Sequence, residues 1–337
     1  MTRSAEVILE VADVTSEALL RQDDEALCDD DLHNAYRSVL GAVAWTVLTL
    51  AILAVYIQAL QRRAHQPRIL DCKRLNVVIR YMKRHKCGLN SICISHPMKL
   101  TAFTDAAFKA QPGDPTGLAF RGLAAVLQSD TGGDKPHGGD GRANLIDFTV
   151  RRQRRVVRST FSAELNGLVD SVEQMILLQC TLHQIYCGTN LTPEDMICAL
   201  EHGALYPPLD VCVDARAVYD AIAATDACDP AECSLKLHLI SVRDRMQAGI
   251  IRRMYWVDTR DMLADGLTKG GIDRTLLQRI SNECRYSTAH ECAVHLKASV
   301  NSSVATKPST SAPRRVSAEE EDESALEGGR PGPETTS

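Results

Sequence analysis

The sequence predicts an α/β protein, with a mixed five-stranded sheet flanked by helices and preceded by a helical segment. From residue 99 onward, short runs rich in β-branched residues alternate with longer stretches of helical apolar spacing. In residues 70–86 the apolar residues recur at helical spacing, without strand-like runs between them. The chain has 337 residues, 45% of them hydrophobic, which is enough for one large or two ordinary domains with buried cores.

Charge is distributed unevenly along the chain. Residues 1–34 carry ten acidic residues against two arginines and predict a flexible acidic leader. Residues 298–337 are rich in Ser, Pro and acidic residues, which predicts a disordered tail. Between residues 35 and 297 the chain holds 32 basic and 26 acidic residues. This mild basic excess is compatible with a polyanionic partner.

The predicted helical segment, residues 35–90, begins with an apolar run. No charged residue occurs over 39–60, a stretch long enough to cross a bilayer as a transmembrane helix. Thr46, Thr49 and Gln58 interrupt this run, so helices that pack within the protein are the alternative. The basic stretch at 70–86 then predicts a helix with one apolar face.

The sheet is expected to contain strands at 99–105, 118–128, 143–151, 209–214 and 250–257. The longest helical pattern, STFSAELNGLVDSVEQMILL, lies between the third and fourth strands. Ser159 or Thr160 can serve as its N-cap, because a hydroxyl there accepts a hydrogen bond from a free backbone N–H group.

Twelve cysteines occur without a CxxC pair and without an N-terminal signal peptide. This usage indicates reduced thiols in an intracellular protein of the cytoplasm or nucleus. Cys180, His183 and Cys187 share one helix face, so a zinc site is conceivable there. A buried helix face of small polarizable residues is the favoured interpretation.

Four acidic residues occupy positions where a lone carboxylate is unfavourable. Asp105 and Asp214 each end a strand pattern, LTAFTD and LDVCVD. Glu164 lies on the apolar stripe of the long helix, and Asp265 lies in MLADGLTK between leucines at helical spacing. Taken singly, Asp105 could be a turn residue and Asp214 a helix cap. Glu164 could be a first-turn acid and Asp265 a surface residue.

Their order along the chain, strand, helix, strand and helix, suggests that the four acids converge. Neighbouring carboxylates would then repel by about 4 kcal/mol per pair at 4 Å and an effective dielectric of 20. Such a cluster requires protonation or bound cations. Oxygen ligands without His or Cys favour Mg²⁺ or Mn²⁺. Two such ions about 4 Å apart activate a water and stabilise the leaving oxygen of a phosphodiester.

The segments TDAAF, RRQRRVVRSTFSAEL, CVDARAVYDAI and WVDTRDMLADGLTK, in this order, resemble the ribonuclease H domain of copia-type retrotransposon Pol polyproteins. The most specific segment is ADGLTK at 264–269. The matching order of all the segments is stronger evidence for the resemblance than any single segment. Upstream, YRSVLGAVAW, LQRRAHQP and KRLNVVIRYMK resemble the thumb and connection region that precedes that domain. The resemblance covers roughly Tyr36 to Ile280.

The resemblance implies a ribonuclease H-like domain over 97–280 and makes Asp105, Glu164, Asp214 and Asp265 the catalytic, metal-binding residues. It implies hydrolysis of the RNA strand of an RNA–DNA hybrid with Mg²⁺ or Mn²⁺. It also implies the rest of the Pol polyprotein as a further partner, while a membrane is the less favoured partner. Phosphate contacts are expected from Arg151, Arg152, Arg154, Arg155, Arg158 and Lys269.

The chain also departs from the family. A charged TRPDI-type segment is replaced by the apolar residues 49–53, and no histidine occurs between Arg252 and Asp265. The paired catalytic aspartates of a polymerase palm are missing. Two alternatives to an active nuclease therefore remain. One is an inert remnant that serves as a membrane-anchored or scaffold protein, and the other is a nucleic-acid-binding module without turnover.

Overall fold

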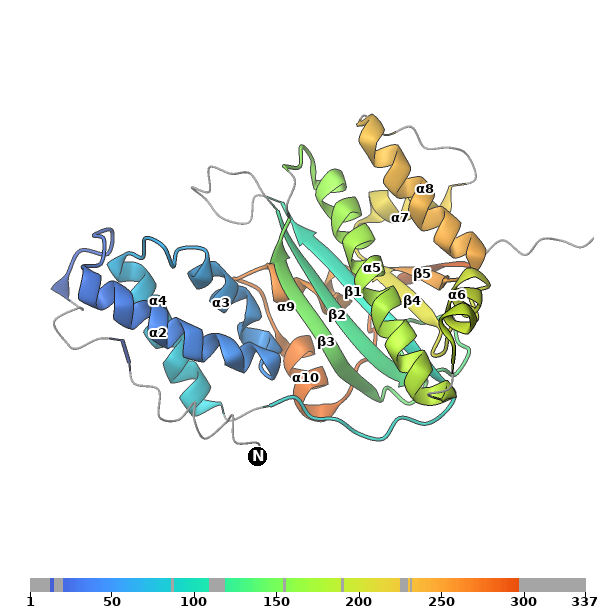
Figure 1. Ribbon diagram of the computed structural model, residues 1–337, viewed down its shortest axis with the longest axis horizontal. Helices are drawn as coiled ribbons and strands as arrows, with labels where there is room; N and C mark the ends of the chain where they lie inside the picture. The colour runs from blue at the N-terminus through green and yellow to red at the C-terminus, as the bar shows by residue number, and fades with distance from the viewer. Residues whose placement is uncertain are drawn as a thin grey trace, which may run out of the picture. The chain divides into compact units, whose positions relative to one another are not determined.

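A computed structural model of the chain describes residues 13–14, 21–85, 88–108, 119–153, 156–188, 191–224, 230 and 232–296. Six strands form one mixed sheet in the order β3-β2-β1-β4-β5-β6 (Figure 1). Strand β2 is antiparallel to its neighbours β1 and β3, β4 and β5 run parallel to β1, and β6 is antiparallel to β5. The strands are Met98–Ala107, Phe120–Ser129, Ala143–Arg152, Leu209–Val213, Ile251–Val257 and Cys292–Leu296.

The five strands expected from the sequence are confirmed, and their ends differ from the prediction by at most two residues. The sequence analysis missed β6, which pairs only with β5 at one edge of the sheet. Its five residues are all partly or fully exposed, and Cys292 and Val294 pack only at the edge of the core, so the short run has no strongly apolar pattern. The predicted domain end at 280 is therefore short, since Tyr286 is buried and the sheet continues to Leu296.

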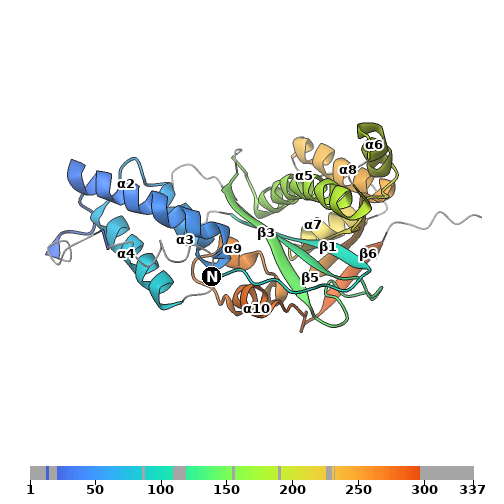
Figure 2. The same cartoon turned by 60° about the horizontal axis from the view of Figure 1, so that its bottom comes forward.

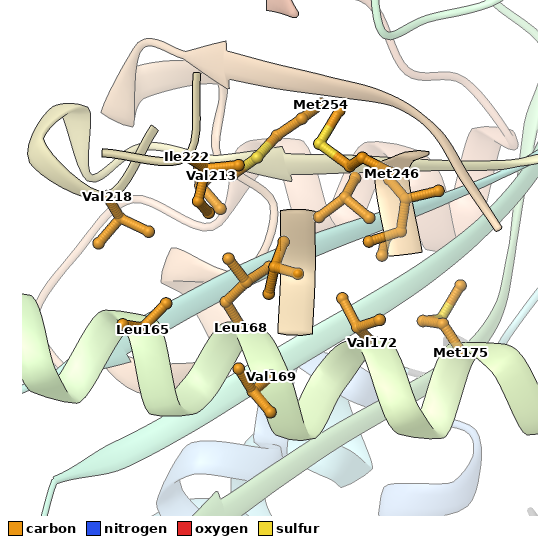
Figure 3. Packing of buried hydrophobic residues seen from close by; sticks show 14 of the residues in the cluster. Leu165, Leu168, Val169, Val172, Met175, Val213, Val218, Ile222, Met246 and Met254 are labelled. Carbon is orange, nitrogen blue, oxygen red and sulfur yellow. The ribbon is translucent and has the colours of Figure 1, made fainter. Parts of the chain in front are cut away.

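Three helices cover one face of the sheet: α5, Thr160–Cys187; α7, Arg216–Ala223; and α8, Cys233–Ala248 (Figure 2). The apolar stripe of α5, including Leu168, Val172 and Met175, packs on Val213 and Met254 of the sheet (Figure 3). Burying each such side chain contributes about 1.5–3 kcal/mol relative to exposure. The short helix α6, Pro193–Glu201, has no buried residue.

The opposite face of the sheet packs against α9, Asp265–Thr268, and α10, Thr275–Glu283 (Figure 2). Alternate residues of the same strands face this second core, for example Phe103 and Cys212. Alternation of this kind follows from the two-residue repeat of a strand. A sheet buried on both faces explains why its strands read as nearly continuous apolar runs.

The segment before the sheet is helical, as expected. Its helices are α2, Asp30–Ala44; α3, Ala54–Gln61; and α4, Ile69–Arg84, with 3₁₀ turns η2, Trp45–Leu48, and η3, Ala51–Leu53. They share a core that contains Tyr36, Ile57 and Leu75. This segment and the sheet belong to one compact unit.

The apolar run at 39–60 is not a single helix, so the transmembrane interpretation is corrected. Helix α2 ends at Ala44, and Thr49 and Leu50 have non-helical backbone angles before α3 begins. The hydroxyl of Thr46 donates to the carbonyl of Val43 at the end of α2, 2.7 Å away. Within the described residues, no helix has the length and apolar character required to cross a membrane.

The predicted acidic leader ends earlier than expected, because α2 already begins at Asp30. Asp29 caps this helix by accepting a hydrogen bond from the N–H group of Leu32, 2.9 Å away. Asp30 and Asp31 in the first turn complement the helix dipole, so acidic residues there favour a helix. Residues 1–12 and 15–20 of the leader, and the predicted tail at 298–337, lie outside the described residues.

Candidate metal centre

Asp105 and Asp214 lie side by side because their strands are neighbours. Strands β1 and β4 run parallel with Thr104 opposite Val213, so the next residues in both strands reach the same level. Asp105 is 2% exposed and Asp214 is half-buried. The Asp214 carboxylate accepts a hydrogen bond from Thr259, 3.2 Å away, and does not cap α7. The cap interpretation of Asp214 is therefore wrong.

Asp265 joins them because α9 lies directly on strand β2. Gly122 of β2 is the register partner of Asp105. A Cβ atom at Gly122 would lie only 2.7 Å from the Thr268 methyl group, so the glycine permits this close approach. With α9 packed on Gly122, Asp265 is 6% exposed, and the Thr268 hydroxyl donates to the Asp105 carboxylate.

These three aspartates each offer an oxygen within 4.8 Å of the other two. In the described part of the chain, they form the only group of three or more His, Cys, Asp or Glu residues close enough to share a metal ion. The helix face with Cys180, His183 and Cys187 is not such a group. There His183 Nδ1 accepts the backbone N–H of Tyr206, 2.9 Å away.

Glu164 lies beside the three aspartates without belonging to their 4.8 Å group. Ser159 caps α5, as predicted, and its hydroxyl accepts the N–H of Ser162. Gly167 lets the helix approach β1, since a Cβ there would lie 3.3 Å from the Ala106 side chain. Glu164 Oε2 then accepts the N–H of Ala106, 3.0 Å away.

Burial and mutual repulsion perturb the acids strongly. Burial, followed by the charges of Asp105 and Asp214, raises the pKa of Glu164 to about 9. Burial and the Asp105 charge raise the pKa of Asp214 to about 6. The same two causes raise the pKa of Asp265 to about 7. Each shift has the sign expected of a carboxyl crowded among other carboxyls in a poorly solvated site.

Lys269 contributes positive charge to this cluster. Its ammonium lies 2.5 Å from Asp265 Oδ1 and 3.5 Å from Asp105 Oδ1. Burial lowers the pKa of Lys269, but Asp105, Asp265 and Asp214 outweigh burial and raise it overall. The expected phosphate contact thus points toward the carboxylates. One ammonium does not balance four carboxyls, and the oxygen-only donor set fits a hard divalent cation such as Mg²⁺ or Mn²⁺.

Of the predicted arginines, Arg151 lies on a strand near the same end of the sheet. Arg151 of β3 is exposed and pairs in register with Arg121, next to Gly122. Strand β3 is two strands away from β1, a distance of about 10 Å at the usual strand spacing. Arg152 is half-buried, Arg158 is exposed just before α5, and Arg154 and Arg155 lie outside the described residues.

Sequence reasoning did not single out Thr268 or the backbone N–H of Ala106. Thr268 donates to Asp105, and Ala106 donates to Glu164. Thr268 lies inside the ADGLTK motif, so the motif itself could have marked it as functional. A backbone donor carries no signal in the sequence.

The chain matches no family model and no curated protein sequence. Among solved structures it is similar to the LC11 ribonuclease H1 in complex with an RNA/DNA hybrid. The two chains are 13% identical, with a TM-score of 0.31, over 50% of this chain and 93% of that one. A likeness this weak adds nothing on function, which has to follow from the side chains.

Proposed function

We propose that this protein is a metal-dependent phosphodiester hydrolase of the ribonuclease H type. The observation that carries the proposal is the group of buried aspartates 105, 214 and 265, with Glu164 beside it, at one end of a mixed sheet. Asp105 lies in β1, Glu164 in α5, Asp214 directly after β4 and Asp265 in α9, which is the order of the sequence motif. The proposed substrate is the RNA strand of an RNA–DNA hybrid.

The three aspartates would hold Mg²⁺ or Mn²⁺, with Glu164 as a further ligand. A divalent ion bound there supplies water activation and stabilises the leaving oxygen of a phosphodiester. The protein contributes the orientation of the ligands, because Thr268 fixes one oxygen of Asp105 and the Ala106 N–H group fixes one oxygen of Glu164. Without metal, Glu164 holds a proton at neutral pH, and cation binding would release it.

The nucleic acid would be held mainly through its phosphates. Arg151, opposite Arg121 next to Gly122, and Arg158, just before α5, are exposed and are the proposed phosphate contacts among the described residues. Recognition of an RNA–DNA hybrid depends on backbone shape and 2′-hydroxyl groups more than on base sequence. We therefore expect strong dependence on salt and little dependence on sequence.

The proposed origin is a copia-type retrotransposon Pol polyprotein. Its support is the ordered set of motifs that ends in ADGLTK. The proposed partners include other Pol segments, and the proposed location is the cytoplasm or nucleus. The described cysteines are all free thiols, in keeping with a reducing compartment.

The test is cleavage of an RNA–DNA hybrid with labelled RNA by the full chain in Mg²⁺ or Mn²⁺. We expect Asp105→Asn and Asp214→Asn to lower the rate by about 10³-fold, because each removes a charged ligand. Asp220→Asn is the matched control, since Asp220 is exposed, pairs with Arg216 within α7 and does not belong to the carboxylate group. An intact hybrid with the wild-type chain, at any divalent concentration, would refute hydrolysis.

A second candidate is a nucleic-acid-binding module without turnover. One observation favours it: Lys269 already lies among the carboxylates, so the fold has a way to tolerate them without metal. This candidate is supported if the purified chain binds the hybrid, leaves it uncut and shows no affinity for Mn²⁺.

A further inference from the structure

A buried arginine holds the segment that carries Asp265 and Lys269. Arg274 is 9% exposed and lies between α9 and α10. Its guanidinium donates to the carbonyls of Gly266, Gly270 and Ile272 at 3.1–3.2 Å, and also to that of Lys269. Four backbone carbonyls from one short segment thus converge on one side chain.

Helix α9 depends on such support because it has only four residues. A single turn of helix is unstable in water, and its last carbonyl groups have no partner inside the helix. Arg274 satisfies the carbonyl of Gly266 in the helix and that of the C-cap Lys269, and its positive charge complements the C-terminal end of the helix. On its other side the helix contacts Gly122 of β2.

The support extends to the helical segment before the sheet. The hydroxyl of Tyr56 in α3 donates to the carbonyl of Gly270, 2.9 Å away. The Arg274 guanidinium lies over the Tyr56 ring, 4.7 Å from its centroid, in a cation–π contact. Both side chains also line a cavity of about 750 Å³ between α3, α4 and α10.

We propose that Arg274 and Tyr56 are positioning residues of the carboxylate centre. Arg274 holds the backbone that aims Asp265 and Lys269 at Asp105, and Tyr56 holds Arg274 and Gly270 from the helical segment. The centre is therefore completed by a part of the chain that contributes no carboxylate to it. This inference rests on the proposed metal site, but its structural half can be tested without metal.

The first test measures Mn²⁺ affinity of the full chain by titration calorimetry or electron paramagnetic resonance. We expect Arg274→Ala to weaken binding by about 10–100-fold, the usual effect of losing a group that orients a ligand. Arg274→Lys should lose less, because it keeps the charge. Tyr56→Phe removes only the hydroxyl and should weaken binding about 2–10-fold, the equivalent of one hydrogen bond. If the wild-type chain cleaves hybrid, these variants should need more Mn²⁺ for half-maximal rate yet regain the rate at saturation.

Tyr81→Phe is the matched control. Tyr81 lines the same cavity, but its hydroxyl accepts a hydrogen bond from the Gln278 side chain of α10, 3.4 Å away, and does not contact the segment after α9. Its Mn²⁺ affinity should equal that of the wild-type chain. Equal affinities in Tyr81→Phe, Tyr56→Phe and Arg274→Lys would overturn the proposal, even if Arg274→Ala failed to fold.

The second test is amide hydrogen exchange of the metal-free chain. Loss of the tyrosine hydroxyl should speed exchange at residues 265–270 in Tyr56→Phe but not in Tyr81→Phe, with the strands unchanged. This result supports positioning even if the wild-type chain neither binds Mn²⁺ nor cuts RNA. Failure to bind Mn²⁺ and to cut RNA would contradict only the proposed function. Unchanged exchange at 265–270 in both Tyr56→Phe and Arg274→Lys overturns the positioning role.

Discussion

Asp105 and Asp210 are two buried aspartates near opposite ends of neighbouring parallel strands, and their surroundings differ. Asp210 is fully buried and is paired with Arg252 at 2.8 and 2.9 Å and with Lys99 at 3.5 Å. Asp105 instead shares a single lysine with two other aspartates. Arg252 also pairs with Asp130, so two cations serve two acids at one end, whereas one cation serves several acids at the other. The excess of acid marks the end suited to a divalent ion.

The Asp210 network predicts a structural role without a part in metal binding. Asp210→Asn leaves the buried Lys99 without its paired carboxylate and leaves Arg252 with Asp130 alone, so the free energy of unfolding should fall by about 3–5 kcal/mol. Urea unfolding measures this loss, with Asp220→Asn as the exposed control. The affinity for Mn²⁺ should stay at the wild-type value, and a tenfold loss would contradict the separation of the two ends.

The raised pKa values predict the pH dependence of the metal-free protein. The pKa values of Asp265 and Glu164 are about 7 and 9 in the folded chain, above the ordinary 3.8 and 4.5. The folded state therefore binds more protons than the unfolded state between these values. The stability that the two protonated carboxyls contribute is fully present below about pH 4. It is lost as pH rises through 7 and then 9.

Thermal unfolding in EDTA checks this sign. The melting temperature should fall between pH 5.5 and 8.5, and Asp265→Asn should flatten the fall by removing one of the titrating groups. Mg²⁺ should restore stability at pH 8.5 more than at pH 5.5, since protons and the ion compete for the same oxygens. A wild-type chain and an Asp265→Asn variant with identical profiles would speak against the crowded cluster.

Among the elements, the contact of α9 with β2 decides whether the candidate centre forms. Gly122→Ala would place a methyl group 2.7 Å from the Thr268 side chain and near the Ala264 carbonyl, so α9 must shift away from Asp105. We expect a loss of about 1–3 kcal/mol in stability, the usual effect of overpacking, together with weaker Mn²⁺ binding. Urea unfolding and metal titration measure the two effects.

Gly41→Ala provides the control for that substitution. Gly41 lies in α2 with nothing within 4 Å of an added Cβ atom, and alanine is the better helix former. This variant should gain about 0.5–1 kcal/mol and keep its metal affinity. If Gly122→Ala behaved in the same way, α9 would not be seated on β2 as described.

For the whole molecule, the proposed binding of nucleic acid should be dominated by phosphate contacts. We expect the affinity for a hybrid to fall steeply with salt, and Arg151→Ala or Arg158→Ala to reduce the slope of log affinity against log salt by about 1 each. Fluorescence anisotropy at several salt concentrations gives this slope. Arg37→Ala is the exposed control, because Arg37 lies in α2 of the helical segment before the sheet. Slopes that equal the wild-type value would remove the two arginines from the interface.

The elements of the sheet and the position of each candidate acid within its element could be predicted from local patterns. Asp105 and Asp214 at strand ends, and Glu164 five residues after the Ser159 cap, follow from apolar periodicity and capping chemistry. The apolar run at 39–60 misled the same reasoning, since length and hydropathy do not reveal a turn at 45–53. Strand β6 was not predicted because it is a short edge strand whose residues are all partly or fully exposed.

The sequence by itself determined the alternation of strands and helices, the four acids in order and the basic run before the long helix, because these depend on residues close together in the chain. Only the tertiary structure decided which acids meet, that Lys269 turns inward and that Arg274 and Tyr56 hold α9 in place. The reason is physical: strand order, a glycine that admits a helix and hydrogen bonds between residues more than 200 positions apart arise only when distant segments pack.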